Sequence, residues 1–286
     1  MANSISISIH NIPHTIPLHV DKEESIFQQI KSWLGSACGA YQFTALIGKV
    51  GALAANVAER VNSVATETFK QVSSVFGKAA GGMTFATSAY AICDTGDQFA
   101  KVLEKGAGEG RGLEAGRRVL DLTESMSYSV MALAPDIESL GPVASVAGLG
   151  VQSISAFQAY ENIAKVDVLL PTVQSEEVKG ALYEEKTFQL LSIVKAVAAV
   201  ATGVIALVGT MVGAALLPPI VSLSIGVALS ILGVVKHFYK ENMTYEPMSK
   251  WKPAEEKADG QDPLAGSVAE QVVDLVNIAV NVVVSP

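Results

Sequence analysis

The sequence contains an uninterrupted run of 40 uncharged residues, from position 196 to position 235. One membrane-spanning helix needs about 20 apolar residues, so the run is too long for one such helix and fits two. Leu217, Pro218 and Pro219 divide it. The residue before a proline disfavours helical geometry, whereas a proline in the first turn of a helix is tolerated. We therefore predict a two-helix membrane hairpin over 187–239, with its bend at these three residues.

Small residues recur at every fourth position in both halves of this hairpin. Such spacing lets the backbones of two membrane helices approach closely. The sequence therefore predicts a helix–helix face made of Gly209, Gly213, Ser222, Gly226 and Ser230. Glycine and serine are frequent in this region, so a chance pattern without packing significance is the open alternative.

The two ends of the hairpin carry residues that suit the boundary between lipid and water. Lys195 and Lys236 border the uncharged run, and Phe238 and Tyr239 follow it. Long lysine side chains reach toward water, and aromatic rings concentrate at the lipid headgroups. We expect these four residues to anchor the hairpin at the membrane surface. Lysines flank the hairpin while its turn is uncharged, so the positive-inside rule predicts that both termini face the cytosol.

The composition of the chain favours an all-α fold. Hydrophobic residues make up 50% of the sequence, aromatic residues 6%, and charged residues 17% against a typical share of about 25%. Alanine, valine and glycine supply most of the apolar share, which suits close helix packing. We predict a helical region over 21–186 that contains an amphipathic helix at 42–76. The uncharged stretch 139–160 is interpreted as a buried bundle helix, with membrane entry as its alternative.

The two ends of the chain differ from the region between them, and the C-terminal helix is compatible with packing back on the bundle, lying on a membrane or binding a partner. Residues 1–20 carry no charge, so they lack the positive start of a secretory signal, and we interpret them as extended or disordered. Prolines among mixed charges in 240–264 are typical of a linker. An amphipathic helix at 266–284 lies in the last segment, 265–286. The predicted architecture is an amphipathic helical bundle, a two-helix transmembrane hairpin and a C-terminal amphipathic helix.

No pattern in the sequence predicts a catalytic, cofactor or metal site. The glycine loop at 106–112 lacks the Gly-Lys-Ser/Thr ending of a phosphate-binding loop. Prolines separate His10, His14 and His19, and no cysteine accompanies them, so we do not expect a metal site there. A net charge of −8 argues against nucleic acid as a partner. We expect a non-enzymatic protein whose partners are membrane lipid and other proteins.

Two features of the sequence resemble chlamydial inclusion membrane proteins. One is the hairpin at 187–239 with its bend at Leu217, Pro218 and Pro219, and the other is the uncharged segment 1–20, which is rich in Ser and Ile. The resemblance is one of hydropathy pattern over about a quarter of the chain, and it transfers no site residue. It implies type III secretion and residence in a vacuole membrane. It also implies soluble parts that face the host cytosol and recruit partner proteins.

Three functions are compatible with the sequence. The first is a secreted membrane effector that presents the helices at 42–76 and 266–284 to partner proteins at a host or vacuole membrane. The second is a pore-forming or translocator protein, in which a soluble helical bundle covers the hairpin until insertion. The third is a soluble α-helical protein with 187–239 as a buried core hairpin. All three leave the oligomeric state open.

Overall fold

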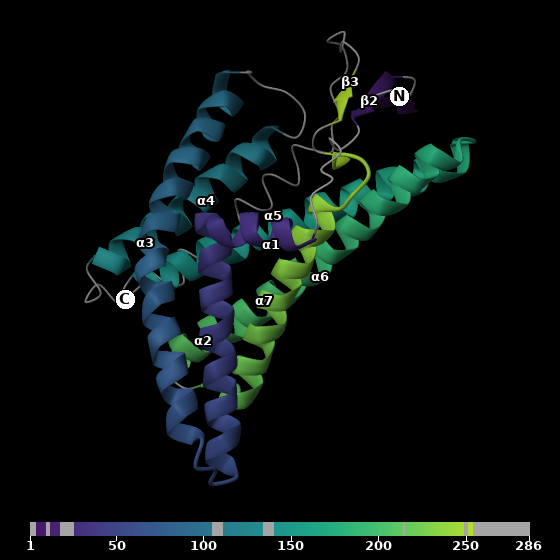
Figure 1. Ribbon diagram of the computed structural model, residues 1–286. Coiled ribbons are helices and arrows are strands. Elements are labelled where there is room, and N and C mark those ends of the chain that lie inside the picture. The colour runs from purple at the N-terminus through teal and green to yellow at the C-terminus, as the bar shows by residue number, and fades with distance from the viewer. Residues whose placement is uncertain are drawn as a thin grey trace.

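The fold is almost entirely helical. The computed structural model describes residues 4–9, 12–17, 26–104, 111–133, 140–213, 215–248 and 251–253. Its helices are α1 (Ile26–Gly35), α2 (Ala37–Arg60), α3 (Thr66–Glu104), α4 (Arg111–Leu133), α5 (Leu140–Leu169), α6 (Glu176–Val212) and α7 (Pro219–Glu241). A single 3-10 turn, η1 (Leu170–Thr172), joins α5 to α6. The predicted all-α class is confirmed (Figure 1).

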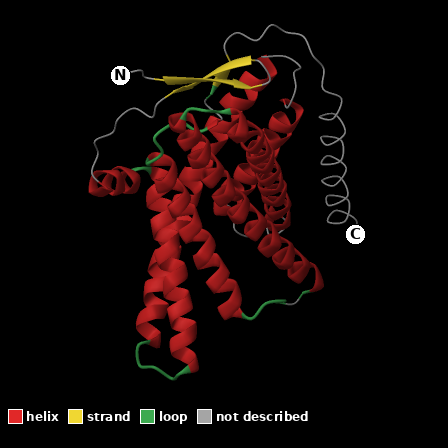
Figure 2. Cartoon of the chain, turned by 90° about the vertical axis from the view of Figure 1, so that its right-hand side faces the viewer, coloured by secondary structure: helices red, strands yellow, loops and turns green. Residues whose placement is uncertain are grey.

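The six long helices form a closed arrangement. Each helix from α2 to α6 packs against the next one along the chain, and α7 packs against both α6 and α2. The turn between α2 and α3 and the turn between α6 and α7 both lie at the end of the molecule away from its small sheet (Figures 1 and 2). The two helical hairpins are therefore neighbours that point the same way.

The amphipathic helix predicted at 42–76 is in fact two helices. α2 ends at Arg60 and α3 begins at Thr66, and Asn62 between them has a φ of +50°. The Thr66 N–H donates to the Ser63 carbonyl, which helps to start α3. The prediction was wrong because valines continue the apolar stripe across the turn, so periodicity alone does not reveal the break. The Asn62–Ser63 pair is the local turn signal.

Close packing of α2 on α3 depends on two glycines of α2. A Cβ added at Gly51 would lie 3.0 Å from the Ser73 backbone nitrogen, and one at Gly48 would lie 3.2 Å from the Gly77 nitrogen. A larger residue at either position would therefore force the two backbones apart.

The start of the chain forms a small antiparallel sheet. β1 (Ser4–Ile9) pairs with β2 (Ile12–Pro17), and β2 pairs at His14 and Thr15 with β3 (Lys252–Pro253). The segment 1–20 was interpreted as extended or disordered. Residues 4–9 and 12–17 are extended and paired with each other. The predicted C-terminal helix over 266–284 lies outside the described residues.

Candidate functional site

Within the described part of the chain, three helical segments are long and apolar enough to cross a membrane. They are Leu140–Thr172, Glu176–Val212 and Pro219–Glu241. The last two are the predicted hairpin. The first contains the stretch interpreted as a bundle helix, and eight residues of α5 are indeed buried, among them Ile154 and Val166. Length and composition therefore support membrane association, and α6 and α7 are more apolar and less buried than the first segment.

The two halves of α6 differ in burial. Seven of its eight buried residues lie at or before Ala196, and the only one beyond is Gly209. In the second half the large apolar side chains of Val204, Val208 and Met211 are 45%, 41% and 54% exposed. Apolar side chains normally lie inside a water-soluble bundle. The second half of α6 is therefore built for apolar surroundings that the described residues do not supply.

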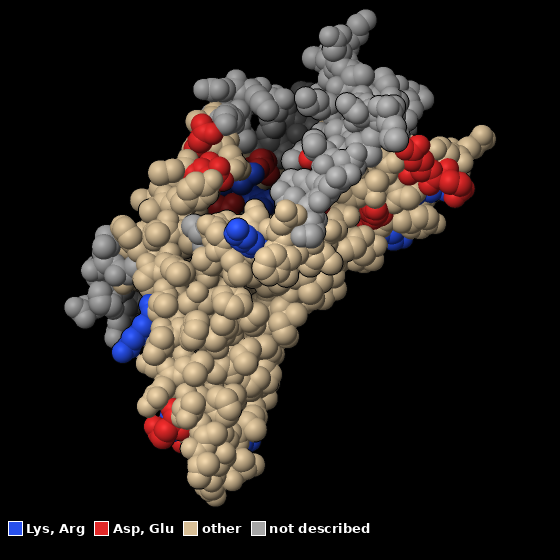
Figure 3. All heavy atoms as spheres, viewed as in Figure 1, with Lys and Arg blue, Asp and Glu red and all other residues tan. Residues whose placement is uncertain are grey.

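α7 extends this exposed apolar surface. None of its 23 residues is buried, and Val221, Ile231 and Val235 are among its exposed side chains. Figure 3 shows a broad surface without charged side chains between the charges at the α2–α3 turn and those nearer the sheet. Contiguous apolar surface of this kind marks contact with a membrane or another protein.

The hairpin turn begins earlier than its predicted bend. α6 ends at Val212, and Gly213 follows in the left-handed region with a φ of +67°. The Gly213 N–H donates to the carbonyls of Gly209 and Thr210, which closes the end of the helix. Leu217 lies in the turn, Pro218 precedes α7, and Pro219 is its first residue. Gly213, predicted as part of a helix–helix face, is thus the residue that stops α6.

The residues of the predicted helix–helix face lie in two different surroundings. Gly209, Gly213 and Ser222 line a cavity of about 400 Å³ near the turn, together with the bend residue Leu217. The rest of the face, Gly226 and Ser230, lies against α2. Lys49 Nζ donates to Ser230 Oγ over 3.0 Å, and a Cβ at Gly226 would lie 3.8 Å from Lys49 Cδ. The spacing of small residues correctly marks close approach but does not tell which helix approaches.

The four predicted anchors lie together at the end of the hairpin away from its turn. Lys236 Nζ stands 4.9 Å from the centre of the Phe188 ring of α6, and the Tyr239 hydroxyl donates to the Glu184 carbonyl over 3.3 Å. The Phe238 ring packs edge-on against Trp33 of α1, with ring centres 5.5 Å apart.

Lys195 completes this group. A Cβ at Gly233 of α7 would lie 3.5 Å from Lys195 Nζ, so the glycine leaves room for the lysine between the two helices. Contacts at the anchor end therefore help to hold α6 and α7 together.

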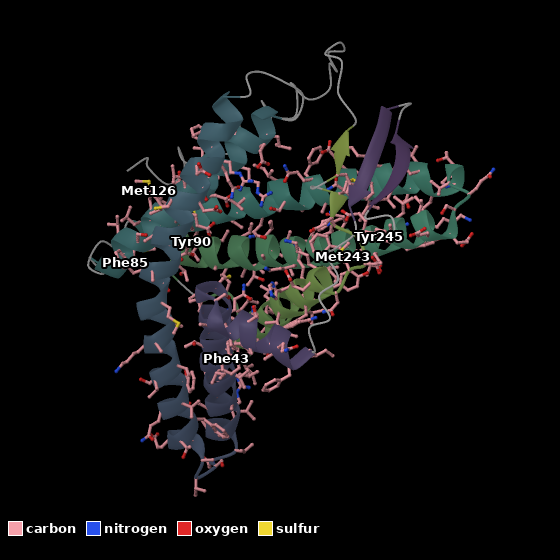
Figure 4. All side chains as sticks on the ribbon, turned by 45° about the horizontal axis from the view of Figure 1, so that its top comes forward. Phe43, Phe85, Tyr90, Met126, Met243 and Tyr245 are labelled. Carbon is pink, nitrogen blue, oxygen red and sulfur yellow. The ribbon has the colours of Figure 1, made fainter. Side chains whose placement is uncertain are left out.

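The segment after α7 packs against the rest of the protein. Residues 243–248 and Trp251 were predicted to belong to a linker over 240–264, and for these residues the prediction is wrong. We call these residues the cap. Met243, Tyr245 and Trp251 are 4%, 6% and 8% exposed. Tyr245 and Trp251 join one small core with residues of α5 and α6: Val166, Leu169, Val178, Ala181 and Leu182. Met243 and Tyr245 lie beside the first half of α6 (Figure 4).

Three glutamates of α6 hold the cap in place. The Tyr245 hydroxyl donates to Glu177 Oε1 over 2.8 Å, and the Thr244 N–H and hydroxyl donate to the Glu184 carboxylate over 2.9 and 2.8 Å. Glu185 is 0% exposed and accepts from the Met248 N–H over 3.0 Å and from the Gln189 amide. Buried carboxylates are stable only when such donors satisfy them. The acidic first half of α6 therefore belongs to a packed, hydrogen-bonded region.

Comparisons with known proteins assign no family. No protein-family model matches the chain, and neither a curated protein nor a solved structure is significantly similar to it. Within the described part of the chain, no group of histidine, cysteine and carboxylate side chains is placed to hold a metal ion.

Proposed function

We propose that the chain is a non-enzymatic protein that inserts into a membrane through α6 and α7 and presents helical surfaces to partner proteins. One observation carries this proposal. α7 has no buried residue and the part of α6 after Ala196 has one, whereas the part of α6 up to Ala196 has seven, and its glutamates are hydrogen-bonded to the cap. The uncharged parts, 196–212 and 219–235, are each about 26 Å long at 1.5 Å per residue, close to a hydrocarbon core of about 30 Å.

The surface offered to partners lies on the α2–α3 hairpin. Val57, Val61 and Val64 are 44%, 70% and 101% exposed near its turn. Val57 and Val61 also line an open groove of about 360 Å³ with Leu53 and Phe69. An exposed apolar strip on a helix is the usual means of binding a partner helix. The finer proposal, a secreted effector in a host vacuole membrane with both termini in the cytosol, rests on the hydropathy pattern of the sequence.

Thiol labelling in liposomes tests this arrangement. Cys38 of α2 and Cys93 of α3 are both exposed. If α6 and α7 make the only membrane crossing, a membrane-impermeant maleimide reaches both thiols from the side that carries the termini. Labelling of one cysteine from that side and protection of the other would overturn the two-crossing arrangement. Detergent-solubilised protein, in which both thiols must react, is the control.

A second candidate function follows from the position of α2 along α7. Lys49 of α2 bonds to Ser230, which lies well inside the uncharged part of α7. The α2–α3 turn carries further charges, including the ion pair between Lys70 and Glu59 at 3.3 Å. A charge at the bilayer centre costs about 2.5–3.5 kcal/mol. Insertion of α7 with α2 still attached would therefore be unfavourable. This contact favours a translocator or pore-forming protein whose α2 covers α7 until insertion.

A cross-link between α2 and α7 separates the two functions. Lys49→Cys and Ser230→Cys, in a background with Cys38→Ser and Cys93→Ser, allow a short thiol cross-linker to hold the helices together. If α2 must leave α7, the cross-linked protein neither inserts into liposomes nor releases an entrapped dye, while each single variant does both. Insertion without dye release, unaffected by the cross-link, supports the effector and counts against the translocator.

A further inference from the structure

A large pocket lies away from α6 and α7, between the start of α2, the middle of α3 and α4, and both apolar and polar atoms line it. Its volume is about 960 Å³. Its lining includes three tyrosines, two carboxylates and one amide: Tyr41, Tyr90, Tyr128, Asp94, Glu124 and Gln42. Of the described residues that line it, none is a lysine or an arginine. Figure 4 places Tyr90 on the opposite side of the molecule from Met243 and Tyr245, so the pocket is separate from the cap.

Two acceptors in this pocket lack donors. Gln42 Oε1 is buried and has no hydrogen-bond partner among the described residues, although its amide nitrogen donates to Cys38 Sγ over 3.3 Å. The Glu124 carboxylate, packed against Gly148 of α5, likewise has no hydrogen bond or ion pair within the described part of the chain. Leaving a buried polar atom such as Gln42 Oε1 unsatisfied costs about 1–3 kcal/mol, whereas the Glu124 carboxylate is only half-buried. A ligand that donates hydrogen bonds here would recover that free energy.

The aromatic lining specifies the rest of the ligand. The pKa of the Tyr128 hydroxyl is raised by burial first, then by the nearby Glu124 and then by Tyr41. Both residues therefore lie close to Tyr128. Ring faces attract cations by about 0.5–2 kcal/mol, and the carboxylates add a negative potential. A quaternary ammonium would suit the rings but has no N–H for Gln42 or Glu124. We propose that the pocket binds a primary organic ammonium group, with Glu124 and Gln42 as acceptors and Tyr41 and Tyr128 against its carbon atoms.

The pocket lies near the anchor end of the hairpin. Ser36 is one of the residues that line the pocket, and its hydroxyl donates to the Trp33 carbonyl over 2.7 Å. Trp33 in turn packs against the anchor residue Phe238. An ethanolamine headgroup of a lipid could therefore supply the ammonium group, and so could a free amine in solution. The two sources share the same chemistry and are distinguished by the experiment below.

Calorimetric titration of the full chain in detergent tests the site directly. Ethanolamine and 1,4-diaminobutane should bind saturably, and tetramethylammonium should bind at least tenfold more weakly. Glu124→Gln should weaken ethanolamine binding about tenfold or more, since a charge-assisted hydrogen bond contributes about 1.5–3 kcal/mol. The matched control, Glu161→Gln at an exposed position of α5, should bind like the wild type.

A folded protein that shows no saturable ethanolamine binding would overturn the site, and so would wild-type affinity in Glu124→Gln. If Glu124→Gln fails to fold by circular dichroism, Gln42→Leu gives the same test, because it removes the unpaired acceptor without changing charge. Tetramethylammonium binding as tight as ethanolamine would also refute the role given to the two acceptors.

Vesicles identify the source of the ammonium group. If the headgroup is the ligand, vesicles rich in ethanolamine phospholipid bind the wild type more tightly than choline phospholipid vesicles, and Glu124→Gln removes the difference. If the ligand is a free amine, the wild type binds both vesicles equally, and 1,4-diaminobutane binds the protein whether or not vesicles are present.

Discussion

The first and second halves of α6 share one helix but meet different surroundings. In the first half, Leu182 and Glu185 are both 0% exposed, and the glutamate has hydrogen-bond donors from the cap and from Gln189. In the second half, Val204 and Val208 are 45% and 41% exposed and face no core. Burying a carboxylate without hydrogen-bond donors costs free energy, and so does exposing a valine side chain to water. Under the proposed function, the change of surroundings near Ala196 marks where α6 passes from water to the apolar part of the membrane.

Charges in the second half of α6 and in α7 should have the largest effect. Val204 and Ala228 lie at the middle of the two uncharged segments and are exposed, so aspartate at either position disturbs little in a water-soluble fold. At the centre of a spanning helix each aspartate costs about 2.5–3.5 kcal/mol. Val204→Asp with Ala228→Asp should abolish insertion into liposomes, measured by flotation. Tyr183→Asp, at an exposed position in the first half, should insert like the wild type, and equal insertion of all three proteins would contradict the comparison.

Core truncation should affect the first half next most strongly. Leu182→Ala should lower the free energy of unfolding of the cap region by about 2–5 kcal/mol, because it leaves a cavity in the small core. Hydrogen exchange at the Thr244 and Met248 amides measures this change locally. Leu190→Ala on the same helix, where the side chain is 47% exposed, should change the exchange by less than about 0.5 kcal/mol. Equal effects of the two variants would show that the first half has no core.

Glu124 tests whether α5 belongs to the bundle. Burial against α5, and then the neighbouring Asp121 carboxylate, raise the pKa of Glu124 from 4.5 to about 7. The folded state then holds the proton more tightly than the unfolded state. The free energy of unfolding should thus be highest below pH 4.5 and fall as the pH rises to about 7, by at most about 1.4 kcal/mol per pH unit.

Thermal melting of the full chain in detergent from pH 5 to 8 checks this dependence, and Glu124→Gln should flatten it. An unchanged slope in that variant would mean that the carboxyl is hydrated and that α5 does not pack on α4 at this point.

Removal of a single hydroxyl should give the smallest effect. Tyr245→Phe removes the donor to the exposed Glu177 carboxylate and should destabilise the cap by about 1 kcal/mol. Tyr183→Phe, with an exposed side chain on the same helix, should leave amide exchange in the cap unchanged. If Tyr245→Phe leaves amide exchange in the cap unchanged, Glu177 contributes nothing to the stability of the cap.

The helical hairpin was predictable because charge and proline act locally. The uncharged run and the two prolines locate the start of α7 closely, since a proline at the first helical position needs no neighbour to explain it. Gly213 carried an equally local signal, because glycine is favoured after the last turn of a helix. Its place in a four-residue pattern of small residues hid that role.

The features that the sequence did not reveal depend on distant partners. The spacing of Gly226 and Ser230 fits any close neighbour, and only the fold shows that Lys49 of α2 is that neighbour. Residues 243–248 belong to a stretch with the prolines and charges of a linker, although they hold only one proline and one charge themselves. The acceptors for their donors lie about 60 positions earlier, at Glu184 and Glu185. The amide of Gln42 and the carboxylate of Glu124 meet in one pocket for the same reason.

Alkaline carbonate extraction of membranes that carry the full chain tests the central claim most directly. Carbonate releases proteins held by surface contacts and leaves those whose helices cross the bilayer. The account predicts that the wild type stays in the membrane pellet and that the variant with Val204→Asp and Ala228→Asp appears in the supernatant. Release of the wild-type chain into the supernatant would contradict the account, because α6 and α7 would then not be inserted.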